Sequence, residues 1–434
     1  MVERMVERGF ERDPAALAIR LHGQRIGVIN RLAGDRHLFA FDQSYVDDPN
    51  RPTLSLAYKS ASGGLVTGVR SYHQRLPPFF SNLLPEGPLR DYLAARAGVK
   101  ASREFFLLNV LGADLPGAIS VAPLYSTGDS AGGSTGDSAA RAAQRAEDDS
   151  EHAHSQPMRF SLAGVQLKFS AVMETNGGLT IPVDGTGGAW ILKLPSSRFE
   201  AVPENEFVML ALARHIGIPV PPVKLVPVSG IAGLPRDAGA ISGQALAAQR
   251  FDRTSAGGRI HMEDFAQVFG LYADDKYEKR SYANIAQVLS AEAGSEAVMD
   301  FTRRLVFAVL IGNADMHLKN WSLLYPDQRR ASLSPAYDYV STVPYLPGDR
   351  LALGFGGSKD ISAITPEQIR RFADTARLAV NPLWRLVHET AERTIAAWQS
   401  LDEKALLPTG IVQAIDVHLL TVATSINQTR PAAG

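Results

Sequence analysis

The first 125 residues begin with alternating apolar and polar positions and then change to helical spacing. Alternation interrupted by turn pairs such as Gly23-Gln24 predicts a β-meander. The predicted strands cover residues 17–22, 25–30, 37–41, 54–58 and 118–123. Apolar residues three or four positions apart predict helices at residues 79–84, 89–97 and 105–111. Together these elements predict an α+β domain over residues 1–125.

A segment without any large apolar residue follows this domain. Residues 126–157 contain no Leu, Ile, Val, Met, Phe, Tyr or Trp, and the hexamer STGDSA occurs in them twice. Such a composition buries too little apolar surface to offset the entropy lost on ordering, which predicts a flexible low-complexity insert. His152 and His154 within it could bind a metal, but two histidines on a solvated segment are the simpler interpretation.

The rest of the chain is first rich in predicted strands and then rich in predicted helices. Strand-like runs cover residues 158–162, 167–173, 179–182, 189–194, 223–228 and 245–251, with one helix at 203–216. Helical periodicity then dominates, at residues 262–269, 282–289, 297–311, 366–378, 382–401 and 410–426. This order predicts two lobes, 158–253 and 254–434, and ligand clefts commonly form between such lobes.

Charge and composition narrow the possible partners. The 44 Lys and Arg residues nearly balance the 45 Asp and Glu residues, which gives a net charge of −1 and no general attraction to nucleic acid or an anionic membrane. The absence of cysteine excludes disulfides, thiolate zinc sites and a cysteine nucleophile. The charged start has no apolar signal region, and no apolar run is long enough to cross a membrane. We expect a soluble, cytoplasmic protein.

The strongest chemical signal is the sequence NADMHLKN at residues 313–320. Its Asp315 precedes Asn320 by five positions, which is the spacing of a kinase catalytic loop. In such a loop the aspartate reaches the acceptor hydroxyl and the asparagine turns back to a phosphate-bound Mg²⁺. Asp338 follows across a predicted hairpin and could be the main metal ligand. Taken alone, the pair could also be a polar turn that caps a helix, and Asp315 with His317 could belong to a metal-dependent hydrolase.

A lysine within an apolar strand supports the kinase interpretation. Burial of an unpaired ammonium is costly, so Lys193 needs an anionic partner such as a nucleotide phosphate. Glu206 lies thirteen residues later on a predicted helix and could form the lysine–glutamate ion pair of kinases. Alternatively, Lys193 extends to the edge of the sheet and Glu206 is an N-terminal helix charge.

Two further segments could contact a nucleotide. Small residues between Ser161 and Lys168 could let backbone N–H groups approach a triphosphate, although the segment is not a Walker A loop and could be a plain hairpin turn. The extended segment that contains Gln249 and Phe251 could present its backbone to an adenine ring. An ordinary linker between lobes is the alternative.

In this order the motifs resemble those of the HipA family, serine/threonine protein kinases that act as toxins of bacterial type II toxin–antitoxin modules. The matching motifs are SLAGVQLK, WILKLP, ENEF, RFDR, NADMHLKN and YDY. The motifs FSNLLPEG and LPGAI in the first 125 residues are similar to the domain that precedes the HipA kinase core. The resemblance covers nearly the whole chain except the insert and the extreme termini.

The resemblance implies a role for each matching residue. Asp315 would be the catalytic carboxylate, Asn320 and Asp338 the Mg²⁺ ligands, and Ser161 the loop serine that is autophosphorylated. The residues assigned to ATP are Gly164, Gln166, Lys168, Lys193, Glu206, Gln249, Phe251 and Lys319. The implied fold is a two-lobed protein-kinase-like core of the α+β class, preceded by the accessory domain.

The resemblance also implies partners. These are a HipB-like helix-turn-helix antitoxin, DNA only indirectly through that antitoxin, and a protein substrate such as an aminoacyl-tRNA synthetase. Two alternatives keep the fold, namely a small-molecule or lipid kinase and a non-catalytic pseudokinase that acts as a scaffold or co-repressor. The presence of Lys193, Asp315, Asn320 and Asp338 argues against the second alternative.

Overall fold

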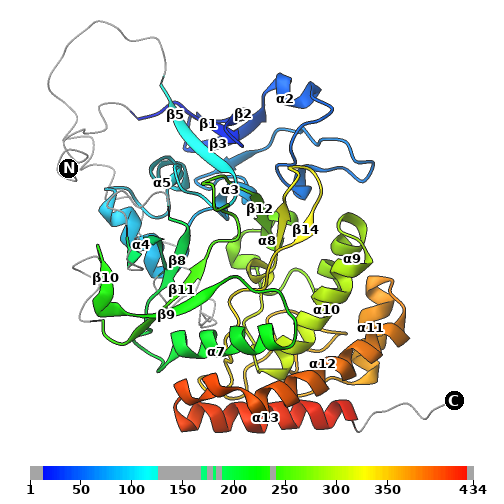
Figure 1. Ribbon diagram of the computed structural model, residues 1–434. Helices are drawn as coiled ribbons and strands as arrows, with labels where there is room; N and C mark the ends of the chain where they lie inside the picture. Colours follow the sequence, from blue (N-terminus) through cyan, green and yellow to red (C-terminus); the bar gives the residue numbers. More distant parts are fainter. Residues whose placement is uncertain (1–12, 126–167, 174–178, 182–187, 235–240, 428–434) are drawn as a thin grey trace, which may run out of the picture.

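The computed structural model describes residues 13–125, 168–173, 179–181, 188–234 and 241–427 of the chain (Figure 1). The predicted insert and the strand predicted at residues 158–162 lie outside the described residues.

The N-terminal part folds around a five-stranded antiparallel sheet with the strand order β4-β3-β2-β1-β5. Its strands are β1 Ala16–Leu21, β2 Gln24–Leu32, β3 Arg36–Phe41, β4 Ser71–His73 and β5 Ile119–Leu124. Its helices are α2 Gln43–Asp47, α3 Pro78–Ser81, α4 Gly87–Arg96 and α5 Glu104–Leu111. The strand predicted at residues 118–123 is present as β5, and it pairs with β1. The rings of Phe39, Phe79, Phe80 and Phe105 are buried in the core of this part.

The prediction of a strand at residues 54–58 is wrong. These residues form a 3₁₀ turn, η1 Leu56–Tyr58, which is N-capped by Ser55. The Ser55 hydroxyl accepts a hydrogen bond from the Ala57 N–H at 3.1 Å. A side chain that bonds the backbone two residues ahead favours a turn over an extended ladder.

The second sheet has six strands among the described residues, in the order β10-β7-β6-β8-β11-β9. Its strands are β6 Lys168–Met173, β7 Leu179–Thr180, β8 Trp190–Lys193, β9 Val223–Pro227, β10 Ile231–Ala232 and β11 Gln244–Gln249. Helix α7 Val202–His215 packs against β9 and β11. Lys193 in β8 is the register partner of Lys168 in β6 and of Leu246 in β11, so β8 lies inside the sheet.

The remaining part is mostly helical and contains a small three-stranded sheet (Figure 1). The helices are α8 Phe265–Val268, α9 Tyr282–Glu292, α10 Ser295–Leu310, α11 Pro366–Ala376, α12 Val380–Ser400 and α13 Thr409–Asn427. The strands are β12 His261–Asp264, β13 Ser322–Tyr325 and β14 Ser332–Leu333. Helix α10 is buried along most of its length and packs against α9, α12 and α13. The catalytic-loop candidate follows directly after this rigid helix.

One predicted helix in this part is wrong in its first half. Residues 261–264 form strand β12, which pairs with β13, and only residues 265–268 are helical. The Asp264 carboxylate accepts a bond from the Gln267 N–H at 2.8 Å, and the Gln267 side chain accepts one from the Asp264 N–H at 2.8 Å. This capping box fixes the helix start at Phe265, a boundary that apolar spacing does not show.

Among the described residues, one helix, α13, is long and apolar enough to pass a length-and-hydropathy test for a membrane span. Its buried residues are Ile411, Ile415, Leu419, Val422, Ala423 and Ile426. All of these except Ala423 belong to the core that α13 shares with α10 and α12. Packing within the fold therefore accounts for these buried residues, whereas Val417 and Leu420 of the same helix are exposed.

A buried glutamate joins the N-terminal part to the small sheet. Glu263 of β12 accepts hydrogen bonds from the Ser55 hydroxyl at 2.5 Å, the Leu56 N–H at 2.9 Å and the Tyr325 hydroxyl at 2.5 Å. Burial raises the pKa of Glu263 to about 7, although the three donors favour its charged form. Burial therefore favours the protonated form of this carboxyl group at pH values where an exposed glutamate is charged.

We predict that this group makes stability depend on pH. Because the pKa of Glu263 is raised in the folded state, its contribution is fully present below about pH 4.5 and is lost as the pH rises through about 7. The free energy of unfolding should fall with pH over that window, with a slope that corresponds to a difference of up to one bound proton between the folded and unfolded states. Glu263→Gln should flatten this slope. Urea unfolding at several pH values measures both, with the exposed Glu296→Gln as control. An equally steep slope in Glu263→Gln would contradict the assignment.

Candidate active site

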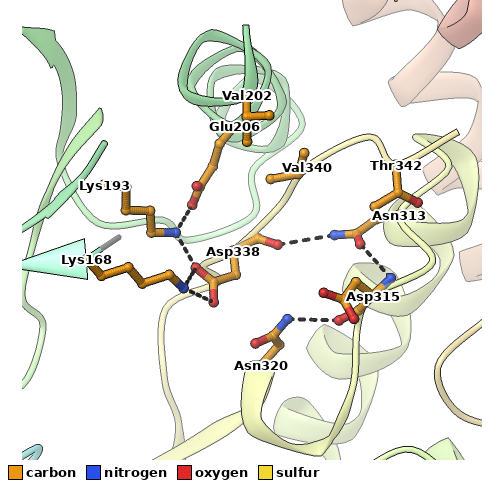
Figure 2. A pocket seen from close by; sticks show the side chains of 10 residues that line it. All are labelled: Lys168, Lys193, Val202, Glu206, Asn313, Asp315, Asn320, Asp338, Val340 and Thr342. Atoms are coloured by element: carbon orange, nitrogen blue, oxygen red, sulfur yellow. Dashed lines mark hydrogen bonds and ion pairs between the residues drawn. The ribbon is translucent and has the colours of Figure 1, made fainter. Parts of the chain in front are cut away.

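A pocket lies between the six-stranded sheet, helix α7 and the loop that follows α10 (Figure 2). Its lining residues are Lys168, Lys193, Val202, Glu206, Asn313, Asp315, Asn320, Asp338, Val340 and Thr342. Six of them are site residues predicted from the sequence: Lys168, Lys193, Glu206, Asp315, Asn320 and Asp338. They come from β6, β8, α7, the loop after α10 and the segment after β14, so the fold brings together residues up to 170 positions apart.

A buried lysine joins the two sides of this pocket. The Lys193 ammonium donates to Glu206 Oε1 on α7 and to Asp338 Oδ1 on the segment after β14 (Figure 2). Lys193 is 5% exposed and Glu206 is 2% exposed, so both charges depend on one another for compensation. The predicted ion pair between the strand lysine and the helix glutamate is therefore present.

The charge on Asp338 is set by two lysines. Lys168 and Lys193 are register partners on β6 and β8, and Lys168 Nζ lies 3.3 Å from Asp338 Oδ2. Burial alone would raise the pKa of Asp338, but the two ammonium charges outweigh it and hold the pKa well below its usual range. Burial raises the pKa of Glu206 instead. Asp338 thus keeps its negative charge, and a carboxylate must be charged to bind a metal cation well.

The backbone at Asp338 has an unusual conformation. Its φ is +56°, in the left-handed region that non-glycine residues occupy at a cost of roughly 1 kcal/mol or more. The Asn313 amide donates to the Asp338 carbonyl at 3.2 Å and helps to hold this conformation. Such strain persists where surrounding contacts impose it, and it aims the carboxylate into the pocket.

The catalytic-loop candidate is closed by its own side chains. The Asn320 amide nitrogen donates to the Asp315 carbonyl at 2.9 Å, and the Asp315 N–H donates to Asn313 Oδ1 at 3.1 Å. The Ala314 N–H donates to Thr342 Oγ1 at 3.0 Å. These bonds tie Asp315 and Asn320 together within the loop, and they use the amide nitrogen of Asn320 rather than its amide oxygen.

Besides the lining valines Val202 and Val340, three polar contributors to the site were not predicted. Asn313 lies in the quoted motif, and its position two residues before Asp315 is the signal that could have identified it. Thr342 and Tyr277 lie outside every motif. The Tyr277 hydroxyl donates to Asp315 Oδ1 at 2.9 Å. No local pattern indicates that contact, because Tyr277 and Asp315 are 38 positions apart.

The structure does not bring Lys319 to the pocket. Its ammonium lies 3.0 Å from Glu86 Oε1, 3.1 Å from Asn82 Oδ1 and 3.7 Å from Asp264 Oδ2. Lys319 and Asn320 are adjacent in the 3₁₀ turn η6 Leu318–Asn320, where successive side chains point in different directions. Asn320 therefore faces the pocket while Lys319 faces the N-terminal part.

The other predicted nucleotide contacts do not line the pocket in the described residues. Gln249 ends strand β11, and the centroids of the Phe251 and Tyr337 rings are 5.4 Å apart. The neighbouring charged residues face the N-terminal part, since Arg250 and Arg253 both pair with Asp114. Ser161, Gly164 and Gln166 lie outside the described residues.

Glu86 of the N-terminal part anchors the outer side of the catalytic-loop candidate. Besides Lys319, it pairs with Lys276 at 2.7 Å. Burial alone would raise the pKa of Glu86, but the charges of the two lysines hold it well below its usual range. The His317 ring packs inside this region, where burial and the nearby Lys276 charge keep its pKa well below the usual value and the ring neutral.

We predict that Glu86→Gln destabilises the fold through this anchor. The change leaves Lys276 and Lys319 without their shared partner, which should lower the free energy of unfolding by on the order of 2 kcal/mol. A fully buried partner would cost more, but the Glu86 side chain is one-third exposed and solvent screens its charge. Glu278→Gln, an exposed neighbour, should change the free energy of unfolding by less than about 0.5 kcal/mol. Urea unfolding compares the two. Equal effects would show that Glu86 has no anchoring role.

Comparison with protein families agrees with this geometry. Residues 17–122 match the family model described as HipA N-terminal domain, and residues 160–398 match the model described as HipA-like C-terminal domain. The chain belongs to the HipA family. The recognised motifs and the two matched regions coincide, so the resemblance predicted from the sequence is confirmed.

Individual proteins are similar over most of the chain. A protein of Sinorhizobium fredii named "Putative kinase Y4dM" is 48% identical over 411 residues, which cover 94% of this chain and 97% of the relative. The "Serine/threonine-protein kinase toxin HipA" of Shewanella oneidensis is 28% identical over 331 residues, which cover 70% of this chain and 72% of the relative.

A solved structure confirms the predicted fold class. It is described as the HipA, HipB and operator DNA complex of the Shewanella oneidensis MR-1 toxin–antitoxin system. The match has a TM-score of 0.70 at 24% identity and covers 95% of this chain and 97% of the other. The two-lobed kinase-like core with an N-terminal α+β domain is therefore the fold of this chain.

Proposed function

We propose that this HipA-family chain is a serine/threonine protein kinase that transfers the γ-phosphoryl group of ATP to a protein hydroxyl. The observation that carries the proposal is the convergence of Lys193, Asp338 and Asp315 on one pocket. The lysine is held by a helix glutamate, and the two aspartates lie on either side of a loop asparagine. Relatives named as kinases support the same reaction class.

In this proposal Asp315 orients the acceptor hydroxyl and accepts its proton. The loop bonds to Asn313 and Asn320 hold the Asp315 backbone before the substrate arrives. Lys193, fixed by Glu206, would bind the phosphates of ATP.

The residues present also fit a Mg²⁺ ion. Mg²⁺ prefers carboxylate and other hard oxygen ligands, and the ionised Asp338 carboxylate and the Asn320 amide oxygen provide such atoms in the same pocket. When bound, the ion would offset the negative charge of the phosphates. Lys168, whose side chain is 30% exposed, would then turn from Asp338 to the phosphates.

Ser161 is the proposed site of autophosphorylation. It precedes Lys168 by seven residues in the segment that we assign to the phosphates of ATP. A phosphoryl group adds close to two negative charges at neutral pH, which would repel the triphosphate and displace this segment. Autophosphorylation would therefore switch the kinase off.

We predict that Asp315→Asn abolishes phosphoryl transfer and leaves the dissociation constant for ATP within about threefold, because Asp315 acts on the acceptor. Asp338→Asn should instead lose the Mg²⁺ dependence of ATP binding. Intact-mass spectrometry after incubation with Mg-ATP, with peptide mapping, measures transfer, and calorimetry measures binding. One phosphate on Ser161 in the wild type only is the expected result.

Other outcomes decide between the alternatives. Undiminished phosphorylation of Asp315→Asn would refute the assignment of the catalytic residue. ATP hydrolysis or transfer without a phosphate on any protein would favour a small-molecule kinase. Absence of ATP binding in the wild type would favour a pseudokinase.

The proposed partners are a HipB-like helix-turn-helix antitoxin and a cytoplasmic protein substrate such as an aminoacyl-tRNA synthetase. The described Shewanella oneidensis complex contains HipA, HipB and operator DNA, which supports the first. With a net charge of −1, this chain gains little from phosphate contacts along DNA, so DNA would be reached through the antitoxin.

We predict that this chain alone does not shift a DNA duplex in a gel at about 150 mM salt, where non-specific binding by a near-neutral protein is weak. A duplex that contains the antitoxin's operator should shift when the antitoxin is added. It should shift further when this chain is added as well. Asp315→Asn should behave as the wild type here. A salt-sensitive shift by this chain alone would contradict indirect binding.

A further inference from the structure

We propose that Tyr277 is a positioning residue that fixes the carboxylate of Asp315 for phosphoryl transfer. The inference rests on the proposed function, since it assigns Tyr277 a role through Asp315. Tyr277 belongs to none of the motifs, and it lies between the 3₁₀ turn η5 Ala273–Asp275 and helix α9.

The contact acts on the carboxylate rather than on the loop backbone. The Tyr277 hydroxyl donates to Asp315 Oδ1 at 2.9 Å. The bonds from Asn320 and to Asn313 involve the Asp315 carbonyl and N–H, so they fix where the loop runs. A carboxylate can still rotate about its Cβ–Cγ bond when its backbone is fixed. A donor on one oxygen sets that rotation and thereby aims the group at the acceptor.

Three contacts hold Tyr277 itself in place. The Lys359 ammonium donates to the Tyr277 carbonyl at 3.1 Å. The Tyr277 ring meets the buried His317 ring edge-on, with centroids 5.2 Å apart. The Lys276 ammonium lies 5.4 Å from the centre of the Tyr277 ring and is paired with Glu86.

This anchoring distinguishes positioning from mimicry of the acceptor. A tyrosine hydroxyl on the catalytic carboxylate could also stand in for the substrate hydroxyl and leave when substrate binds. Such a placeholder needs a side chain that moves easily. Tyr277 is instead fixed by its backbone, by a buried ring and by a neighbour tied to the N-terminal part. The substrate would approach Asp315 with Tyr277 still bound.

The chain offers a matched control in Tyr282. Its hydroxyl donates to the Met316 carbonyl at 3.0 Å, so it bonds the same loop one residue further along but at the backbone. Removal of either hydroxyl with phenylalanine deletes one hydrogen bond to this loop. Only Tyr277→Phe deletes a bond to the Asp315 carboxylate.

The test compares the full-length wild type, Tyr277→Phe and Tyr282→Phe. It measures the single-turnover rate of autophosphorylation, the dissociation constant for ATP and the melting temperature of each. We expect Tyr277→Phe to lower the rate about tenfold to hundredfold, as for a lost hydrogen bond to a charged group, with ATP binding within about twofold. Tyr282→Phe should lower the melting temperature while its rate stays within about threefold of the wild type.

Each other outcome overturns the inference in an identifiable way. Equal rates for Tyr277→Phe and wild type, or equal losses for the two variants, would remove the positioning role. A Tyr277→Phe variant that autophosphorylates faster than the wild type would show a placeholder instead. A wild type that binds ATP but transfers no phosphate would refute the proposed function, and the inference with it.

Discussion

The arrangement of the lobes depends on one buried ammonium group. Lys193 stands between Glu206 on helix α7 and Asp338 on the segment that follows the small hairpin. An unpaired charge at this depth would cost several kcal/mol, so the contact among the sheet, the helix and the Asp338 segment stabilises their arrangement. Asp338 also lines the same pocket as Asn320 and Asp315. The electrostatic requirement of the core and the geometry of the pocket are thus satisfied together.

The sequence predicts this centre better than its surroundings. Lys193, Glu206, Asp315, Asn320 and Asp338 could be identified because each stands in a motif or in a position where a charge needs a partner. The turn at residues 56–58 was predicted as a strand, because a cap formed by one serine overrides apolar alternation. Tyr277, Glu86 and the outward direction of Lys319 could not be predicted, since they depend on contacts between distant segments and on the path of a 3₁₀ turn.

Polar contacts at several places tie the N-terminal part to the kinase-like core. Glu86 and Asn82 hold Lys319 behind the catalytic loop, Ser55 bonds Glu263 at the small sheet, and Asp114 pairs with Arg250 and Arg253 at the junction of the lobes. These contacts are polar and buried or half-buried. Separation of the N-terminal part from the core would leave their donors and acceptors without partners, which costs free energy. Removal of this part would leave several charges of the core without partners.

The long sequence separation of these contacts has a consequence during synthesis. Asn82 and Lys319 are 237 residues apart, and at about 5 to 20 residues per second the ribosome needs roughly 10 to 50 s to proceed from one to the other. The N-terminal part can fold in that interval, before residue 319 is synthesised. The catalytic loop then acquires its described geometry only after emerging, by docking onto a surface already formed. A truncated translation product would therefore carry an ordered accessory domain and no assembled active site.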